Sequence, residues 1–253
     1  MDFTGKKVVI TGCGPDFGRT LSVCFARLGC ELFLSARSLD KAEETARIVG
    51  TQVADSKTHC FKADIAKPAD IQAFAESVAK VSSSVDVLIN NASAWLQGDL
   101  SSASDEAILE TINSTFTGAV LTTKHFLPLL MSSGAPDIVN INGTPGLYNA
   151  RHHTAHVAFS AAKAGQAAFA DRLRHRTRGT GLRVITIVPP NFENTSPLDE
   201  KVWSERRPAG QKEDDYLTAR NVFECVRFAL AQDRICCIDE IVLSNNSPGG
   251  GHT

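Results

Sequence analysis

A cluster of glycines near the start of the chain could bind phosphate. Gly12, Gly14 and Gly18 follow a run of β-branched residues and precede a stretch with apolar residues at helical spacing. Free backbone N–H groups and the helix dipole both favour an anion at such a strand–turn–helix junction. We therefore predict that this turn, including Asp16 and Phe17, binds the phosphates of a nucleotide. The alternative is a tight turn that holds no ligand.

Polar side chains follow the next two predicted strands and could bind the rest of a dinucleotide. Arg37 comes soon after the strand at residues 31–35. A guanidinium there suits a 2′-phosphate, whereas an acidic residue would bind a free ribose hydroxyl. Asp64 and Ile65 follow the strand at residues 58–63, where they could meet an adenine. The pattern favours NADP over NAD, with an arginine that caps the next helix as the alternative.

Strand and helix signals alternate along the chain, and these elements must position the candidate residues. Apolar and β-branched runs predict strands at residues 6–11, 31–35, 58–63, 85–89, 138–141, 182–188 and 240–243. Apolar residues at helical spacing predict helices at residues 19–28, 39–49, 71–81, 105–131 (with Ser104 as its N-cap), 154–177 and 219–232.

This alternation predicts an α/β fold. With right-handed crossovers it gives a single Rossmann-type, doubly wound parallel sheet of about seven strands flanked by helices. We expect one domain over residues 1–246 and a disordered tail at residues 247–253. Ligands of such a sheet bind beyond the carboxyl ends of its strands, where the glycine turn, Arg37 and Asp64 all lie.

The composition suits one sizeable α/β domain. The chain has 253 residues, of which 43% are hydrophobic and 21% are charged. The net charge of −2 gives no overall field that would attract nucleic acid or an anionic membrane, and no apolar run is long enough to span a bilayer. The seven cysteines form no C-x-x-C pair, which favours reduced thiols. We expect a cytoplasmic protein without a signal peptide, with a small-molecule substrate as its partner and no nucleic-acid or membrane partner.

Taken together, these motifs resemble the short-chain dehydrogenase/reductase family over nearly the whole chain. The matching positions are Thr11, Gly12, Gly18, Asp64, Asn90, Asn91, Ala92, Asn113, the strand at residues 138–141, and Lys163. The resemblance implies a Rossmann-type subunit with an NAD(P) cofactor, usually in a homodimer or homotetramer built on two long helices. It also implies cofactor contacts from Asn91, Ala92, Lys163 and Pro189.

The catalytic set of that family is kept only in part. The resemblance implies catalytic roles for Asn113 and Lys163, but the family's Tyr position is Phe159 and its Ser position is Gly143. Loss of a general acid costs about 10²–10⁴ in rate. Loss of a donor to a developing oxyanion costs about 10²–10³. Asp16 also replaces a usual glycine, and its carboxylate would disfavour a pyrophosphate unless it turned away to cap the helix.

Two nearby residues could supply the missing proton and are therefore included as catalytic candidates. His156 lies three residues before Phe159 on the same helix face, with capping of the helix start as the simpler alternative. Tyr148 lies in the loop after the fifth strand, where an aromatic pocket wall is the alternative. His152 and His156 have helical metal spacing, but no further ligand is evident, so we expect no metal.

These residues predict a divergent NADP(H)-dependent oxidoreductase that acts on a small organic molecule without the Ser–Tyr pair. Two alternatives stay open. One is a catalytically inactive nucleotide-binding sensor or scaffold, and the other is a cofactor-assisted isomerase or cyclase. The polar segment at residues 195–211, which contains Trp203, suggests a lid over the pocket without naming a substrate.

Overall fold

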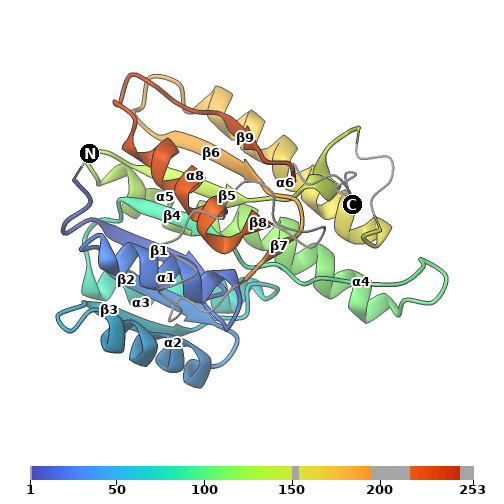
Figure 1. Cartoon of the computed structure of the whole chain (residues 1–253), viewed down its shortest axis with the longest axis horizontal. Helices are drawn as coiled ribbons and strands as arrows, with labels where there is room; N and C mark the ends of the chain where they lie inside the picture. The colour runs from blue at the N-terminus through green and yellow to red at the C-terminus, as the bar shows by residue number, and fades with distance from the viewer. Residues whose placement is uncertain (1, 150–153, 195–216, 246–253) are drawn as a thin grey trace, which may run out of the picture.

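The computed structural model describes residues 2–149, 154–194 and 217–245. Its centre is a parallel sheet of seven strands in the order β3-β2-β1-β4-β5-β6-β9 (Figure 1). These strands are β1 (Lys7–Thr11), β2 (Glu31–Ala36), β3 (Thr58–Lys62), β4 (Val87–Asn90), β5 (Asp137–Ile141), β6 (Arg183–Val188) and β9 (Glu240–Val242). The winding direction reverses between β1 and β4, which is the ligand-binding position of such folds. The predicted doubly wound sheet is confirmed.

Helices cover both faces of this sheet. One face is covered by α1 (Phe17–Arg27), α2 (Leu39–Gln52) and α8 (Ala219–Ala231). The other is covered by α3 (Pro68–Val81), α5 (Gly118–Met131) and α6 (Val157–Arg176). The helix α4 (Asp105–Ile112) extends from the body of the molecule in Figure 1. Two short strands, β7 (Phe192–Glu193) and β8 (Leu217–Thr218), pair with each other outside the main sheet.

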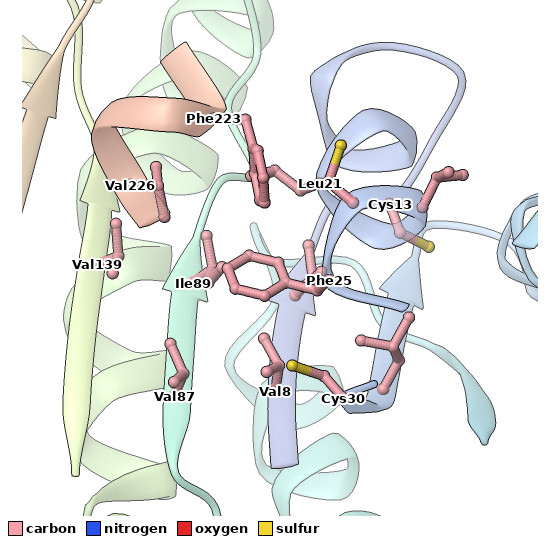
Figure 2. Close-up of a cluster of buried hydrophobic side chains, with 14 of the residues drawn as sticks. Val8, Cys13, Leu21, Phe25, Cys30, Val87, Ile89, Val139, Phe223 and Val226 are labelled. Carbon is pink, nitrogen blue, oxygen red and sulfur yellow. The ribbon is translucent and has the colours of Figure 1, made fainter. Parts of the chain in front are cut away.

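Two apolar clusters hold these layers together. In the first, Phe25 of α1 meets Phe223 of α8 edge to face, with ring centroids 5.4 Å apart, and Figure 2 shows both rings above the strands. In the second, Phe74 of α3 meets Phe126 of α5 at 5.0 Å. Successive strand residues belong to opposite clusters, as Val8 and Ile10 do to the first and Val9 to the second, so the strands are buried on both faces.

The long helix expected at residues 105–131 is divided. Between α4 and α5 the chain forms a π-helical turn (Asn113–Thr117), in which the N–H of Gly118 donates to the carbonyl of Asn113. Such a turn takes one more residue than regular α-helix, and no glycine or proline marks its start. The predicted N-cap is confirmed, since the N–H of Ala107 donates to Ser104 Oγ at 3.2 Å. The predicted tail and the possible lid lie outside the described residues.

A row of small polar residues crosses the sheet near the carboxyl ends of its strands. Thr11 pairs in register with Ser35, and Asn140 pairs with both Asn90 and Thr186. All five are buried, and each lies two residues beyond a member of the cluster under α3, α5 and α6. Among the described residues, Ser35 Oγ, Asn90 Oδ1 and Asn140 Nδ2 have no hydrogen-bond partner. This polar row therefore replaces the apolar core directly below the ligand-binding edge.

A compact ion-pair network lies at the opposite ends of the strands. The buried Asp137 accepts two bonds from Arg183, at 2.7 and 3.0 Å, and a third from Arg234 at 2.7 Å. Arg183 also donates to the carbonyls of Leu230, Gln232 and Cys236. The network fastens the starts of β5 and β6 to the connection between α8 and β9.

Candidate functional site

The glycine turn has the tight geometry that its sequence predicted. Gly12 has a φ of +67°, and a Cβ there would lie 2.9 Å from Ala92 Cα. A Cβ on Gly18 would lie 2.0 Å from the Gly12 oxygen. Gly14 differs, because a Cβ there would meet no atom within 4 Å. Gly12 and Gly18 are therefore needed for packing, whereas Gly14 leaves space open in front of the turn.

Two polar side chains brace this turn from below. Thr11 Oγ1 accepts from the N–H groups of Asn91 and Ala92, at 3.0 and 3.1 Å, and donates to the Ile89 carbonyl. The Asn91 side chain donates to the carbonyls of Thr11 and Gly12, both at 3.0 Å. The side-chain amide of Asn91 thus holds the end of β1 against the end of β4.

A cavity of about 420 Å³ opens in front of the turn. Nine of the predicted cofactor-binding residues line it: Gly12, Gly14, Asp16, Phe17, Arg37, Asp64, Ile65, Asn91 and Ala92. Three others do not, since Gly18 packs under the turn, the Pro189 carbonyl accepts from the Thr144 N–H, and Lys163 lies deeper. The open space at Gly14 and the start of α1 fit the phosphates of a dinucleotide.

Asp16 does not cap α1 with its side chain. It occupies the N-cap position, is exposed, and makes no side-chain capping bond. The carboxylate therefore lines the cavity. Binding of a ligand with several phosphates would be favoured if this carboxylate turned away from the cavity.

The far end of the cavity carries both signs of charge. Arg37 Nη1 lies 2.8 Å from Glu110 Oε1 of α4, and Lys41 lines the same cavity. Asp64 pairs with Lys67 at 3.3 Å and accepts from the Ala66 N–H. Helix α2 begins after Ser38, so Arg37 points to the cavity and does not cap that helix. Sequence reasoning missed Glu110, although it lies on α4 only three residues before Asn113.

Two segments form the walls. Ser93 and Ala94, which follow β4, bond to Thr115 and Ser114 of the π-helical turn at 2.9 and 3.1 Å. On the other side, Phe192 packs edge to face on Phe17 with centroids 5.1 Å apart. The π-helical turn therefore fixes the strand-end loop that borders the cavity.

Lys163 of α6 is a buried cation without an anionic partner among the described residues. Its Nζ donates to the Ile141 carbonyl at 2.9 Å, and Ile141 lines the cavity. Burial is the cause that lowers the pKa of Lys163 to about 7. The amine can therefore exchange a proton near neutral pH.

The ring of Phe159, at the position of the family's Tyr, lies over this amine. Phe159 is buried, lies 5.6 Å from Lys163 Nζ, and meets Trp95 edge to face at 4.8 Å. At Gly143 the backbone is extended, and a Cβ would meet Pro145 Cδ at 3.3 Å. Sequence reasoning missed Trp95, whose position four residues after Asn91 was its only signal.

The remaining catalytic candidates lie apart from the cavity lining. His156 caps α6, since its Nδ1 accepts from the Ala158 N–H at 3.1 Å, and its buried Nε2 has no partner among the described residues. Tyr148 is fully exposed. Asn113 opens the π-helical turn. None of these three is among the residues that line the cavity.

The described part of the chain contains neither a metal-binding cluster nor a membrane-spanning helix. Within residues 2–149, 154–194 and 217–245, no cluster of three His, Cys, Asp or Glu side chains could hold a metal ion. His152 lies outside these ranges. Over the same ranges, every helix is too short or too polar to cross a bilayer.

Known proteins share both the sequence pattern and the architecture of the chain. It is 29% identical to the dehydrogenase/reductase SDR family protein 7-like of Anopheles gambiae, over 76% of this chain and 60% of that protein. The chain matches only 56% of the length of the corresponding Drosophila melanogaster protein. It is 26% identical to the NADP-dependent 3-hydroxy acid dehydrogenase of Schizosaccharomyces pombe, over 98% of this chain and 96% of that enzyme.

Solved structures show the same fold. A metagenomic short-chain oxidoreductase in complex with NADP superposes with a TM-score of 0.78 at 20% identity, over 96% of this chain and 98% of that one. The alcohol dehydrogenase of Thermococcus sibiricus, complexed with 5-hydroxy-NADP, gives a TM-score of 0.79 at 23% identity, over 94% of this chain and 95% of that one. The family model described as short chain dehydrogenase matches residues 6–206. The chain therefore belongs to the short chain dehydrogenase family.

Proposed function

We propose that the chain is an NADP(H)-dependent oxidoreductase that acts on a small organic substrate without the Ser–Tyr pair of its family. One observation carries the proposal: the braced glycine turn, Arg37 and Asp64 line one continuous cavity at the winding reversal between β1 and β4. The names of the fission-yeast relative and of two similar structures, which include NADP or a derivative of it, support this choice of cofactor.

Different residues of the cavity would bind different parts of such a cofactor. The space before Gly14 and the free N–H groups of α1 suit the diphosphate, and Arg37 with Lys41 suits a further phosphate on the ribose. When bound, a nicotinamide dinucleotide supplies hydride transfer to or from carbon. Lys163 adds a group beside Ile141 that holds or releases a proton near neutral pH.

The first test is calorimetric titration of the purified chain with NADPH and then with NADH. We expect NADPH to bind more tightly, and Arg37→Ala to weaken NADPH binding by about tenfold because it removes a charge-assisted bond. NADH binding should change little in that variant. Absence of binding by either nucleotide would contradict the proposal.

The second test is consumption of NADPH over panels of enones, imines and ketones. We expect turnover with polarised C=C or C=N bonds, because their reduction depends less on the missing hydroxyl pair. Turnover that falls in Lys163→Met, measured at saturating NADPH, would support a role of the amine. No consumption with any substrate class would remove the catalytic part of the proposal and leave the binding part.

The second candidate is a nucleotide-binding protein without turnover. The position of Phe159 favours it, because this ring lies over the Lys163 amine in place of a tyrosine hydroxyl and is itself packed against Trp95. Phe159→Tyr with Gly143→Ser should then create carbonyl reduction where the native chain shows none. A serine fits at Gly143, since the backbone is extended and only Pro145 Cδ, at 3.3 Å from the new Cβ, must shift slightly.

A further inference from the structure

The ion pair between Arg37 and Glu110 joins two segments that line the cavity. Arg37 follows β2 and Glu110 belongs to α4, with 2.8 Å between Nη1 and Oε1. Both side chains line the cavity, and they are 68% and 50% exposed, so a ligand can reach each of them. Glu110 thus occupies donors of the guanidinium group that, under the proposed function, binds the ribose phosphate.

A carboxylate and a phosphate use the same donors of a guanidinium. Both accept hydrogen bonds from its planar N–H groups, so Glu110 and a phosphate compete for Arg37. An added dianionic phosphate would also be repelled by the carboxylate at short range. Glu110 therefore disfavours a phosphate-bearing ribose through two effects of the same sign.

The other charges of the cavity strengthen this conclusion. Among the described residues, its titratable lining consists of two cations, Arg37 and Lys41, and three carboxylates, Asp16, Asp64 and Glu110. Asp64 is already paired with Lys67. Glu110 is therefore the carboxylate that forms an ion pair with a cation expected to bind phosphate.

We propose that Glu110 is a specificity-determining residue that lowers the affinity of the cavity for a 2′-phosphorylated dinucleotide relative to the unphosphorylated one. The inference rests on the proposed function, because it assumes that the adenosine end of the nucleotide lies between Arg37 and Asp64. Arg37 and Glu110 then act in opposite directions on the same choice, and the preference for NADPH is smaller than the arginine alone would give.

The test measures binding and not activity. Dissociation constants for NADPH and NADH are determined by calorimetry for the native chain, Glu110→Gln, Arg37→Gln and the double variant. Glu110→Gln should tighten NADPH by about 3–10-fold, as expected for the loss of one exposed competing ion pair and one nearby like charge. NADH should change by less than about twofold, and the gain should shrink at high salt. In the Arg37→Gln background the gain should shrink to the part that comes from repulsion between the carboxylate and the phosphate, because no arginine is left to compete for.

Glu106→Gln is the matched control, since Glu106 is an exposed glutamate one turn earlier on α4 that does not line the cavity. It should leave both constants unchanged. Equal tightening of NADPH and NADH by Glu110→Gln, or no change in either, would overturn the inference while leaving the proposed function intact. Failure of both nucleotides to bind any of the four proteins would overturn the proposed function and the inference together.

Discussion

At the amino ends of β5 and β6, Asp137 is held by two arginines, whereas near the carboxyl ends of the sheet Lys163 has one backbone acceptor. In the Asp137 network, each buried charged side chain makes several hydrogen bonds. Near the carboxyl ends, Asn90, Asn140 and His156 each keep an atom without a partner among the described residues. An unpaired buried polar group costs about 1–3 kcal/mol, so it persists where a ligand or water completes it. The charged side chains at the amino ends of β5 and β6 thus satisfy one another, whereas the side chains near the carboxyl ends leave polar atoms available to a ligand.

The largest effect on stability should come from breaking the Asp137 network. Asp137→Ala leaves the buried Arg183 without its anion, and we expect the free energy of unfolding to fall by about 3–5 kcal/mol. Urea unfolding measures this loss. Glu224→Ala removes the exposed pair with Arg227 and should cost about 0–1 kcal/mol. A loss as small as that control for Asp137→Ala would mean that the network does not fasten the strands.

Replacing the buried amine of Lys163 should instead raise the free energy of unfolding. An unfolded chain has its lysines at the ordinary pKa of 10.5, whereas burial lowers the pKa of Lys163 to about 7. Between these values the unfolded chain binds a proton that the folded chain lacks, so this group contributes stability that rises with pH. Lys163→Met should therefore stabilise the chain, on the order of a few kcal/mol at pH 7 and below, and its advantage should shrink as the pH rises toward 10.5.

The measurement is urea unfolding of the native chain and Lys163→Met at about pH 6, 7.5 and 9. Taking the difference between the two proteins cancels the buried thiols, whose raised pKa values act in the opposite direction at high pH. Lys80→Met, at an exposed position of α3, is the matched control. A difference that stays constant with pH would show that Lys163 keeps its ordinary pKa.

The smallest effects compare two neighbours in the polar row. Thr11→Val leaves two N–H groups and one carbonyl without their partner and should cost about 2–3 kcal/mol. Ser35→Ala removes an oxygen that has no partner among the described residues and should change stability by less than about 1 kcal/mol. Thermal unfolding of both variants tests the pair. Equal losses would mean that Ser35 is hydrogen-bonded in solution, with ordered water as the plain explanation.

Sequence periodicity was sufficient for the fold, and the reason is local. Strand runs such as residues 182–188 and the capping signal at Ser104 depend on neighbours in the chain, and both are confirmed. The π-helical turn was missed because it depends on how α4 and α5 pack, and no glycine or proline marks its start. The sequence likewise left open whether Asp16 turns away to cap α1, and its side chain makes no such bond.

The site was predictable where a motif fixes the backbone, and less so where side chains meet across the cavity. The glycine turn and Arg37 line the cavity as expected. Glu110 reaches it from α4, whereas Trp95 packs on Phe159 without lining it, and contacts between such separate segments leave no local pattern in one sequence. The roles assigned to Asn113, Lys163, His156 and Tyr148 stay predictions that the binding and turnover tests address.

The π-helical turn also makes the length of its helix functionally important. Because it holds one extra residue, deleting Ser114 would let α4 and α5 join as regular helix and would rotate α4 by about 100° about its axis. Glu110 would then leave the cavity, and another face of α4 would meet Arg37. A change in chain length by one residue of this turn would therefore exchange the side chain that opposes the arginine.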